Sequence, residues 1–433
     1  MGALIGGTRR AAAGAAMIVV VLGAAFFAHA RVARAALLHA SLLSSEPRDG
    51  AVLSVSPARI RLVFSEPLEP SMSALAWEAA PQSAPALAAG VDPHDVHALL
   101  ATPGTLPPGR YVVGWRVVSA DGHRVDGRIS FRIAGADGDS AALAVQTPSD
   151  TMSTRVTPGR TERDLSRATR ILRASAVTAL LALAGLLMMI AILPLSGPRP
   201  IRLAAILGVM ATVLLASYTV AWALEVARGV GAPVDAVMTA TSTTPGALEV
   251  ARVALSLLAL WAVGLARRPG LAALFAVLAT LITGASGHSA VILPYWSIPL
   301  KAIHLFGAAL WLGGLLWIVT AERHGDRYVQ GARRVSQIAL WAVALVLGTG
   351  IAQSALFLPS LPALYESNFG RVVLLKLAGL FVLLLFGAYH RRIVPRMDTT
   401  MARRRLRRSV RAEIAVMLAV SALGGVLATI APR

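Results

Sequence analysis

The sequence contains no cysteine among its 433 residues. Disulfide bonds therefore cannot stabilise it, and metal sites built on thiolates, such as cysteine-bound zinc and iron–sulfur clusters, are excluded. Any metal ion must be bound by histidine, aspartate, glutamate, methionine or backbone atoms. The sequence also lacks the glycine-rich loop ending in Gly-Lys-Ser/Thr that binds nucleotide phosphates, which disfavours direct ATP-driven pumping by this chain.

Acidic residues are scarce: there are 22 of them against 41 lysines and arginines, which gives a formal net charge of +19. The positive excess is uneven along the chain. Residues 39–134 contain eight arginines and nine acidic residues, so this part is close to neutral. A neutral first part removes the main support for nucleic-acid binding. Most of the arginines lie instead between apolar runs in the second half of the chain.

The N-terminus has the pattern of an export signal. Arg9 and Arg10 precede an Ala/Val/Leu-rich run over residues 11–28, and small residues follow this run. We interpret residues 1–38 as a signal peptide. An N-terminal membrane anchor that is not cleaved is the alternative.

Residues 39–134 contain short alternating stretches that are separated by turn residues. Arg59–Phe64 alternates between apolar and polar residues, and Arg110–Val118 and Arg128–Ile133 have a similar β-type pattern. Such stretches at close spacing predict a small antiparallel β-sandwich or barrel. We expect Trp77 and Trp115 to lie in its core.

The remainder of the chain, residues 170–433, is dominated by apolar runs, and a polar segment over residues 135–169 is interpreted as a linker. Hydrophobic residues make up 56% of the whole sequence, above the usual globular share of roughly 45–50%. We predict about eight transmembrane helices, most of them near the ~20 residues that cross a bilayer. The expected spans are Ile171–Leu193, Ile201–Leu224, Leu248–Leu265, Leu271–Ala285, Ile298–Val319, Val335–Leu356, Val372–Tyr389 and Ala412–Ile430.

The arginines between these spans predict the orientation of the chain. If the β domain is exported, the first, third, fifth and seventh connections face the cytoplasm, and together with Arg202 at the start of the second span they contain 17 arginines. The other connections contain few basic residues, which agrees with the positive-inside rule. The Arg403–Arg408 run is therefore interpreted as a cytoplasmic anchor. We expect a multi-pass protein of the cytoplasmic membrane with an extracytoplasmic β domain.

A candidate metal site lies near the end of the predicted β domain, in the stretch VVSADGHRVDG from Val117 to Gly127. In an extended segment the side chains of Asp121 and His123 leave on the same side. Carboxylate and neutral imidazole together suit Cu(II). The alternative is a hairpin turn, for which Asp-Gly is common, followed by an exposed histidine without a function. The residues alone leave both interpretations open.

Two blocks of the first part, His39–Leu68 and Tyr111–Phe131, together resemble the periplasmic copper-binding protein CopC. In the second part, Gly287–Ala290, His304–Trp317 and Phe369–Leu377 resemble the membrane protein CopD. The whole chain is similar to the fused CopC–CopD proteins of bacterial copper handling. This resemblance implies a multidomain fold: an all-β Greek-key domain of the cupredoxin or immunoglobulin type, followed by an all-α polytopic membrane bundle.

The resemblance also implies a Cu(II) site with His39, Asp121 and His123 as ligands. The first of these is expected to begin the mature chain and to chelate the ion through its imidazole and its free α-amine. The amine loses its proton on binding, so affinity falls in acid. The residues before His39 depart from the small residues that signal peptidase prefers, and cleavage elsewhere would remove the amine ligand. Glu66 is a candidate to hold a ligand in position, with turn capping or a solvated position as the alternative.

Other candidate ligands are less specific. Met72 is the only methionine in residues 39–134, so we predict a single Cu(II) site there rather than an additional methionine-rich Cu(I) site. His94 and His97 have a spacing that could bind a metal, although a solvated loop is favoured. In the membrane part, His288 and His304 are candidate sites for Cu(I) or Cu(II), because ionisable residues inside membranes usually have a function. An interhelical hydrogen bond is the alternative for these two.

The resemblance implies copper import: the β domain captures Cu(II) outside the membrane and the helices pass copper inward. Copper chaperones are candidate partners, and no enzymatic activity is expected. A second hypothesis is copper sequestration, resistance or sensing without transport. A third is a haem-containing electron carrier, which needs facing histidine pairs. Only His304 is clearly within a span, and His390 is at a cytoplasmic end. Trp311 and the Gly313-Gly314 pair are assigned to helix packing.

Overall fold

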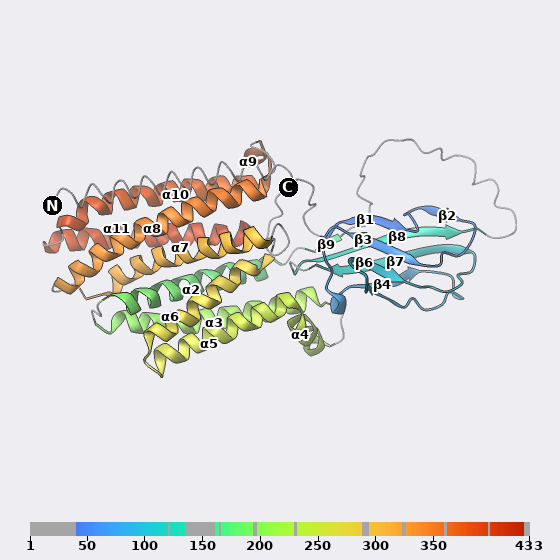
Figure 1. Ribbon diagram of the computed structural model, residues 1–433, viewed down its shortest axis with the longest axis horizontal. Coiled ribbons are helices and arrows are strands. Elements are labelled where there is room, and N and C mark those ends of the chain that lie inside the picture. The colour runs from blue at the N-terminus through green and yellow to red at the C-terminus, as the bar shows by residue number, and fades with distance from the viewer. Residues whose placement is uncertain are drawn as a thin grey trace. The chain divides into compact units, whose positions relative to one another are not determined.

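The computed structural model describes residues 40–119, 122–134, 161–163, 166–193, 197–228, 232–287, 294–322, 326–358, 362–396 and 399–427. The expected signal peptide, His39, Asp121, His288 and most of the expected linker lie outside these residues. The described residues form two compact units, one rich in β-strands and one helical (Figure 1). Each unit is described by itself.

The β unit contains two sheets. The first has the strand order β1-β3-β6-β5, with bounds Leu42–Glu46, Ile60–Phe64, Asp95–Ala101 and Ala89–Asp92. The second has the order β2-β8-β7-β4, with bounds Ala51–Leu53, Arg124–Ile133, Gly109–Val118 and Ala74–Ala79, and β9 (Thr161–Arg163) also pairs with β8. A short 3-10 helix, η2 (Pro70–Met72), precedes β4. The pairs are antiparallel as predicted, except that β2 pairs with β8 in parallel.

The core of the β unit lies between the two sheets, because strands of both contribute to one hydrophobic cluster. In β3, the residues from Ile60 to Phe64 alternate between buried and half-buried, as a strand with one buried face requires. The ring of Trp115 on β7 meets that of Phe64 edge-on, with centroids 5.1 Å apart. Opposite Trp115 on β8 lies Gly127, and a Cβ there would overlap the indole. Trp77 is half-buried at the edge of the cluster, and its Nε1 donates to the carbonyl oxygen of Pro85 at 2.9 Å.

The helical unit confirms the expected apolar helices. Each of the eight predicted spans coincides with one helix: α2 (Arg167–Ile192), α3 (Arg199–Val226), α5 (Thr244–Gly264), α6 (Pro269–Ile282), α7 (Pro294–Thr320), α8 (Asp326–Phe357), α10 (Asn368–Ile393) and α11 (Thr400–Leu427). The structure adds the short helix α9 (Ala363–Glu366) here and the short helix α4 (Pro233–Ser242) in the compact unit that contains the strands, which brings the α-helices of the described residues to ten. Two 3-10 turns, η4 (Thr283–Ala285) and η6 (Val394–Arg396), follow α6 and α10.

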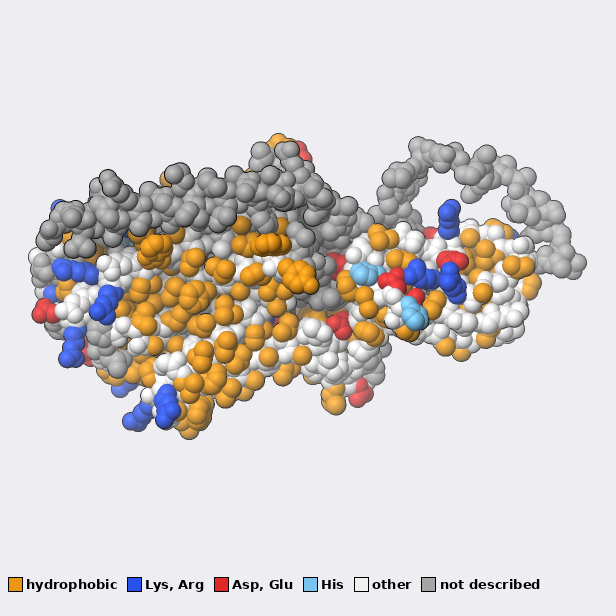
Figure 2. All heavy atoms as spheres, in the orientation of Figure 1, with side chains coloured by type: hydrophobic (Ala, Val, Ile, Leu, Met, Phe, Trp, Pro, Cys, Tyr) orange, Lys and Arg blue, Asp and Glu red, His pale blue; other side chains and the backbone are white. Residues whose placement is uncertain are grey.

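By length and composition, six of the described helices can cross a membrane: α2, α3, α5, α7, α8 and α10. The prediction of eight transmembrane helices is therefore confirmed for six, because the described parts of α6 and α11 do not meet both conditions. The segment Pro269–Ala285 is a shorter apolar helix. It corresponds to Leu271–Ala285, the shortest of the eight predicted spans. Figure 2 shows hydrophobic side chains over much of the visible surface of the helices, with lysines and arginines gathered at one end. On α10, Leu375, Phe381 and Leu385 are each more than half exposed. Such a surface suits contact with lipid rather than with water.

Close packing of α2 against α7 depends on glycine. Gly185 on α2 lies against the backbone of Ala309 and Gly313 on α7, so closely that a Cβ at Gly185 would overlap the Ala309 carbonyl group. Gly314, on the same helix, faces Val335 of α8. The predicted packing role of Gly313-Gly314 is confirmed, since small residues let helix backbones approach in a membrane.

Candidate metal centre

The predicted turn between β7 and β8 is present, and it holds a buried histidine. The amide of Gly122 donates to the carbonyl oxygen of Ser119 at 2.8 Å. The amide of Ser119 in turn donates to the carbonyl oxygen of His123 at 3.1 Å. Gly122 has a φ of +82°, a left-handed conformation that glycine adopts without strain. His123 is only 7% exposed. The stretch is thus a hairpin turn, but the alternative of an exposed histidine is wrong.

Glu66 lies beside this turn. Leu68 forms a β-bridge with Ser119, and the amide of Glu69 donates to the carbonyl oxygen of Val118 at 2.8 Å. Glu66 precedes these contacts in the chain and is 3% exposed. A solvated Glu66 is therefore excluded. A carboxylate removed from water needs a partner, and both Glu66 and His123 have polar or ring partners in the structure.

The start of the described chain lies next to the same segment. The amide of Ser65 donates to the carbonyl oxygen of Ser41 at 2.9 Å, and the amide of Ser41 donates to Ser65 Oγ at 2.9 Å. Ala40 is fully buried and belongs to the hydrophobic cluster of the β unit. The segment Ser65–Glu69 is consequently bonded on one side to the first described residues and on the other to the turn that contains His123.

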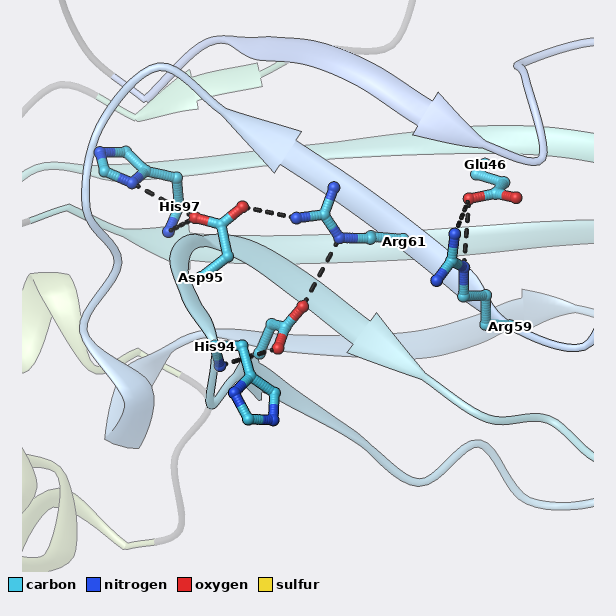
Figure 3. Close-up of polar contacts among 7 residues, drawn as sticks. Glu46, Arg59, Arg61, His94, Asp95 and His97 are labelled. Atoms are coloured by element: carbon cyan, nitrogen blue, oxygen red, sulfur yellow. Dashed lines mark hydrogen bonds and ion pairs between the residues drawn. The ribbon is translucent and has the colours of Figure 1, made fainter.

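His94 and His97 are not brought together. Asp92 Oδ1 accepts from the amide of His94 at 2.9 Å, and Asp95 Oδ1 accepts from the amide of His97 at 3.0 Å. Arg61 bridges the two carboxylates, with Nε 3.5 Å from Asp92 Oδ2 and Nη2 donating to Asp95 Oδ2 at 2.5 Å. The two imidazole rings point to different sides of the hairpin (Figure 3). The contact with the amide of His97, and then Arg61, lowers the pKa of Asp95.

These carboxylates stabilise the β5–β6 turn and do not form a chelating set. Within the residues that the structure describes, no group of three or more histidine, aspartate or glutamate side chains is arranged to hold a metal ion. Two of the three expected Cu(II) ligands, His39 and Asp121, lie outside those residues.

In the helical unit, His304 faces the interior. Its Nδ1 lies 3.0 Å from Thr349 Oγ1 on α8, and that hydroxyl donates its own hydrogen to the carbonyl oxygen of Leu345 at 2.5 Å. In the tautomer with the hydrogen on His304 Nδ1, the threonine oxygen accepts it and Nε2 has a lone pair. The expected interhelical hydrogen bond is present. His288 lies outside the described residues.

Sequence reasoning missed two groups of buried polar side chains between the helices. In one, Trp311 donates from Nε1 to Glu413 Oε1 at 2.9 Å, and His390 lies against the same carboxylate. In the other, Glu249 pairs with Arg252 inside α5. The available signal was the presence of ionisable residues within predicted apolar spans, which merit a functional hypothesis by default. Trp311 is therefore more than a packing residue.

Two family models match this chain. Residues 42–134 match the CopC domain, and residues 329–427 match copper resistance protein D. The copper transport protein CutJ of Bacillus subtilis (strain 168) is 27% identical over 418 residues, which cover 88% of this chain and 72% of CutJ. Copper resistance protein C of Xanthomonas campestris pv. juglandis is 39% identical over 107 residues, which cover 23% of this chain and 82% of that protein.

Among solved structures, CopC from Methylosinus trichosporium OB3b matches with 25% identity and a TM-score of 0.21, over 23% of this chain and 98% of that chain. PcoC, a methionine-rich copper resistance protein from Escherichia coli, matches with 34% identity and a TM-score of 0.20, over 22% of this chain and 99% of that chain.

A β-sandwich with a buried histidine in one hairpin turn, joined in one chain to a bundle of apolar helices, defines a two-part membrane protein. The chain belongs to the family in which a CopC domain and a copper resistance protein D domain are fused.

Proposed function

We propose that this protein binds Cu(II) with its β unit outside the cytoplasmic membrane and passes copper inward through its helical unit. The observation on which the proposal depends is the burial of His123. Turn residues of a hairpin are normally solvated, but this imidazole is 7% exposed beside the Glu66 segment. A buried imidazole directly before strand β8 suits a metal ligand held in a fixed orientation. The names of the relatives, which refer to copper transport and copper resistance, support copper as the ion.

The proposed ligands are His39, Asp121 and His123, which supply the nitrogen and oxygen set that Cu(II) favours. Support comes from the described neighbours of the first two. Ala40 follows His39 and is buried next to the Ser65–Glu69 segment, and consecutive Cα atoms are about 3.8 Å apart. Gly122, which lies between Asp121 and His123 in the sequence, donates its amide hydrogen to the carbonyl oxygen of Ser119. Glu66, buried between these parts of the chain, would orient a ligand through a hydrogen bond.

Inside the membrane, His304 is the proposed copper ligand among the described residues, with His288 as a second. The contact with Thr349 orients the His304 ring, and in the tautomer with the hydrogen on Nδ1 the other nitrogen, Nε2, would bind the ion. Metal-binding histidines commonly donate their other N–H in this way, which fixes the tautomer.

The test compares two single substitutions of histidine in the β unit of the full-length protein. His123→Ala is expected to abolish tight Cu(II) binding, whereas His97→Ala, which removes an imidazole from the exposed hairpin, should leave it unchanged. Cells that express the wild-type protein should accumulate more copper than cells with His123→Ala or His304→Ala. Equal Cu(II) affinity of the two β-unit variants would refute the proposed outer site.

Copper sequestration or sensing without transport is the second candidate function, and the membrane variants distinguish it. It predicts that His123→Ala lowers bound copper while His304→Ala and His288→Ala leave copper accumulation unchanged. The haem hypothesis has less support, since His304 contacts Thr349, and His390 contacts Glu413 and Ser409, rather than a facing histidine.

A further inference from the structure

A second buried polar group lies at the arginine-rich end of the helical unit. Four side chains from three helices meet there: Trp311 of α7, His390 of α10, and Ser409 and Glu413 of α11. His390 begins the basic end of α10, followed directly by Arg391 and Arg392. Helix α7 contributes both to this group, through Trp311, and to the contact between His304 and Thr349.

Glu413 is the central residue of this group. It is 1% exposed, and its Oε1 accepts the hydrogen of Trp311 Nε1 at 2.9 Å. Among the described residues its other oxygen, Oε2, is buried and makes no hydrogen bond. A carboxylate oxygen without a hydrogen bond in a dry interior is costly, so a cation near Oε2 would stabilise it.

The cation position is defined by His390. Its Nδ1 lies 3.1 Å from Glu413 Oε2, and its Nε2 lies 2.9 Å from Ser409 Oγ. When Nε2 donates its hydrogen to Ser409, Nδ1 presents a lone pair toward the carboxylate oxygen. In this tautomer the two lone pairs repel each other, and either a proton on Nδ1 or a metal ion between the two atoms relieves the repulsion.

The separation fits two ligands of one metal ion. First-row metal ions bind imidazole nitrogen and carboxylate oxygen at about 2.0–2.2 Å. Ligand atoms 3.1 Å apart then subtend an angle of roughly 95–100° at the metal, which suits two neighbouring positions of a tetragonal copper site. Trp311 is a donor only and does not coordinate, so it holds Glu413 in position.

We propose that His390 Nδ1 and Glu413 Oε2 form an inner site that binds a copper ion in transit. The inference rests on the proposed function, in which copper moves through the helical unit. Two protein ligands make a weak site, and a transit site must bind weakly enough to release its ion. His304 and Trp311 are seven residues apart on α7, which places them two turns, or about 10 Å, apart on one side of that helix. The helix thereby connects the proposed membrane ligand to the residue that positions Glu413.

The direct test titrates the full-length His123→Ala, His304→Ala double variant with Cu(II) salts alone. Bound copper per chain and electron paramagnetic resonance spectra are measured. This background should retain a Cu(II) signal with nitrogen coupling. Because His39 and His288 remain in this background, adding His390→Gln should remove one nitrogen-coupled copper per chain rather than the whole signal, and adding Glu413→Gln should weaken binding of that copper by at least about tenfold, the lower end of the cost of perturbing a metal site.

Two control variants separate copper binding from helix packing. Glu366→Gln makes the same chemical change on the exposed helix α9 and should have no effect. Trp311→Phe removes the contact with Glu413 Oε1 but no ligand, so the nitrogen-coupled signal should persist at saturating copper. If Glu413 only anchors Trp311, Glu413→Gln will bind copper as the background does, and the inner site is refuted. Where Glu413→Gln fails to fold, His390→Gln decides the question alone.

Copper accumulation in cells distinguishes failure of this site from failure of the proposed function. If cells that express the wild-type protein accumulate no more copper than cells without it, the proposal of inward transport is wrong. The titration still decides whether the inner site exists. If cells with the wild-type protein accumulate copper, and Glu413→Gln matches its reference in both the accumulation assay and the titration, only the proposal of the inner site is wrong. The expected result is accumulation by Glu366→Gln at the wild-type level and a clear loss in His390→Gln and Glu413→Gln.

Discussion

Glu249 and Arg252 form an ion pair in the interior of the helical unit, at 4% and 0% exposure. Arg252 Nη1 donates to Glu249 Oε1 at 3.0 Å, and Nη2 lies 3.0 Å from Oε2. Arg173 Nη2 donates to Ser286 Oγ at 3.4 Å, and Lys301 Nζ donates to the carbonyl oxygen of Ser286 at 2.5 Å. Lys301 interacts electrostatically with Arg173, Arg252 and Glu249. Glu249 is therefore the acidic partner of Arg252 in a region that also contains the basic side chains of Arg173 and Lys301.

We predict that Glu249→Gln strongly destabilises the helical unit. It leaves Arg252 buried without its counter-charge, and breaking a buried pair in this way costs roughly 3–5 kcal/mol. The Glu249→Gln, Arg252→Gln double variant should lose less stability than Glu249→Gln alone, because no uncompensated guanidinium remains in α5. Thermal unfolding of the purified protein in detergent measures this. Exposed Glu366→Gln is the matched control, and equal melting of Glu249→Gln and Glu366→Gln would contradict the prediction.

Gly185 and Gly387 should respond in opposite directions to the same substitution by alanine. At Gly185 of α2 the new Cβ would overlap the backbone of α7, so Gly185→Ala should push the two helices apart and lower the melting temperature. At Gly387 of α10 no atom lies within 4 Å of the new Cβ. There Gly387→Ala should be neutral or stabilising by up to about 1 kcal/mol, because alanine is the better helix former. A loss of stability at both positions would mean that the α2–α7 contact is not special.

Local patterns predicted most of the architecture. The alternation from Ile60 to Phe64 and the apolar runs are set by which side of an element faces water, core or lipid, so they can be recognised within one segment. The parallel pairing of β2 with β8 escaped prediction because Ala51–Leu53 is three residues long and its partner lies about 80 residues later. The helices α4 and α9 escaped because they are too short to span a bilayer.

The sites were less predictable, since they depend on contacts between distant segments. The Asp-Gly-His stretch indicated a turn and a metal ligand as alternatives, and the described part of the structure shows the turn together with a buried histidine. The burial of Glu66 results from bonds that its neighbours make to Ser41 and Ser119. Trp311 was assigned to packing because its acceptor, Glu413, is 102 residues away in the sequence.

Asp95 should stabilise the β5–β6 hairpin near neutral pH and lose this effect in acid. The amide of His97 and the guanidinium of Arg61 lower the pKa of Asp95 in the folded protein. A lowered carboxyl pKa contributes stability above the unfolded value of about 3.9, and that stability is lost as the pH falls through the folded value. Asp95→Asn should therefore destabilise the β unit at pH 7 but not at pH 2–3. Calorimetry of the β-unit transition at several pH values measures the difference.

A control is available on the neighbouring strands. Glu46 and Arg59 form an ion pair at 3.1 Å in which both side chains are more than half exposed. Glu46→Gln should change stability at pH 7 by no more than about 0.2–1 kcal/mol, the range for surface pairs. If Asp95→Asn is as harmless as Glu46→Gln at every pH, the hairpin network has no stabilising role.

Glu69 is expected to show the opposite pH dependence. Its amide is bonded to Val118 beside the His123 turn, and burial raises the pKa of its carboxyl group. Stability from a raised carboxyl pKa is fully present below the unfolded value of about 4.3 and is lost as the pH rises through the folded value. Glu69→Gln, neutral at every pH, should therefore melt higher than the wild type at pH 7, and the difference should shrink toward pH 4. Glu78→Gln, on exposed β4, should show no such convergence. A Glu69→Gln effect that stays constant from pH 4 to pH 7 would contradict the assignment.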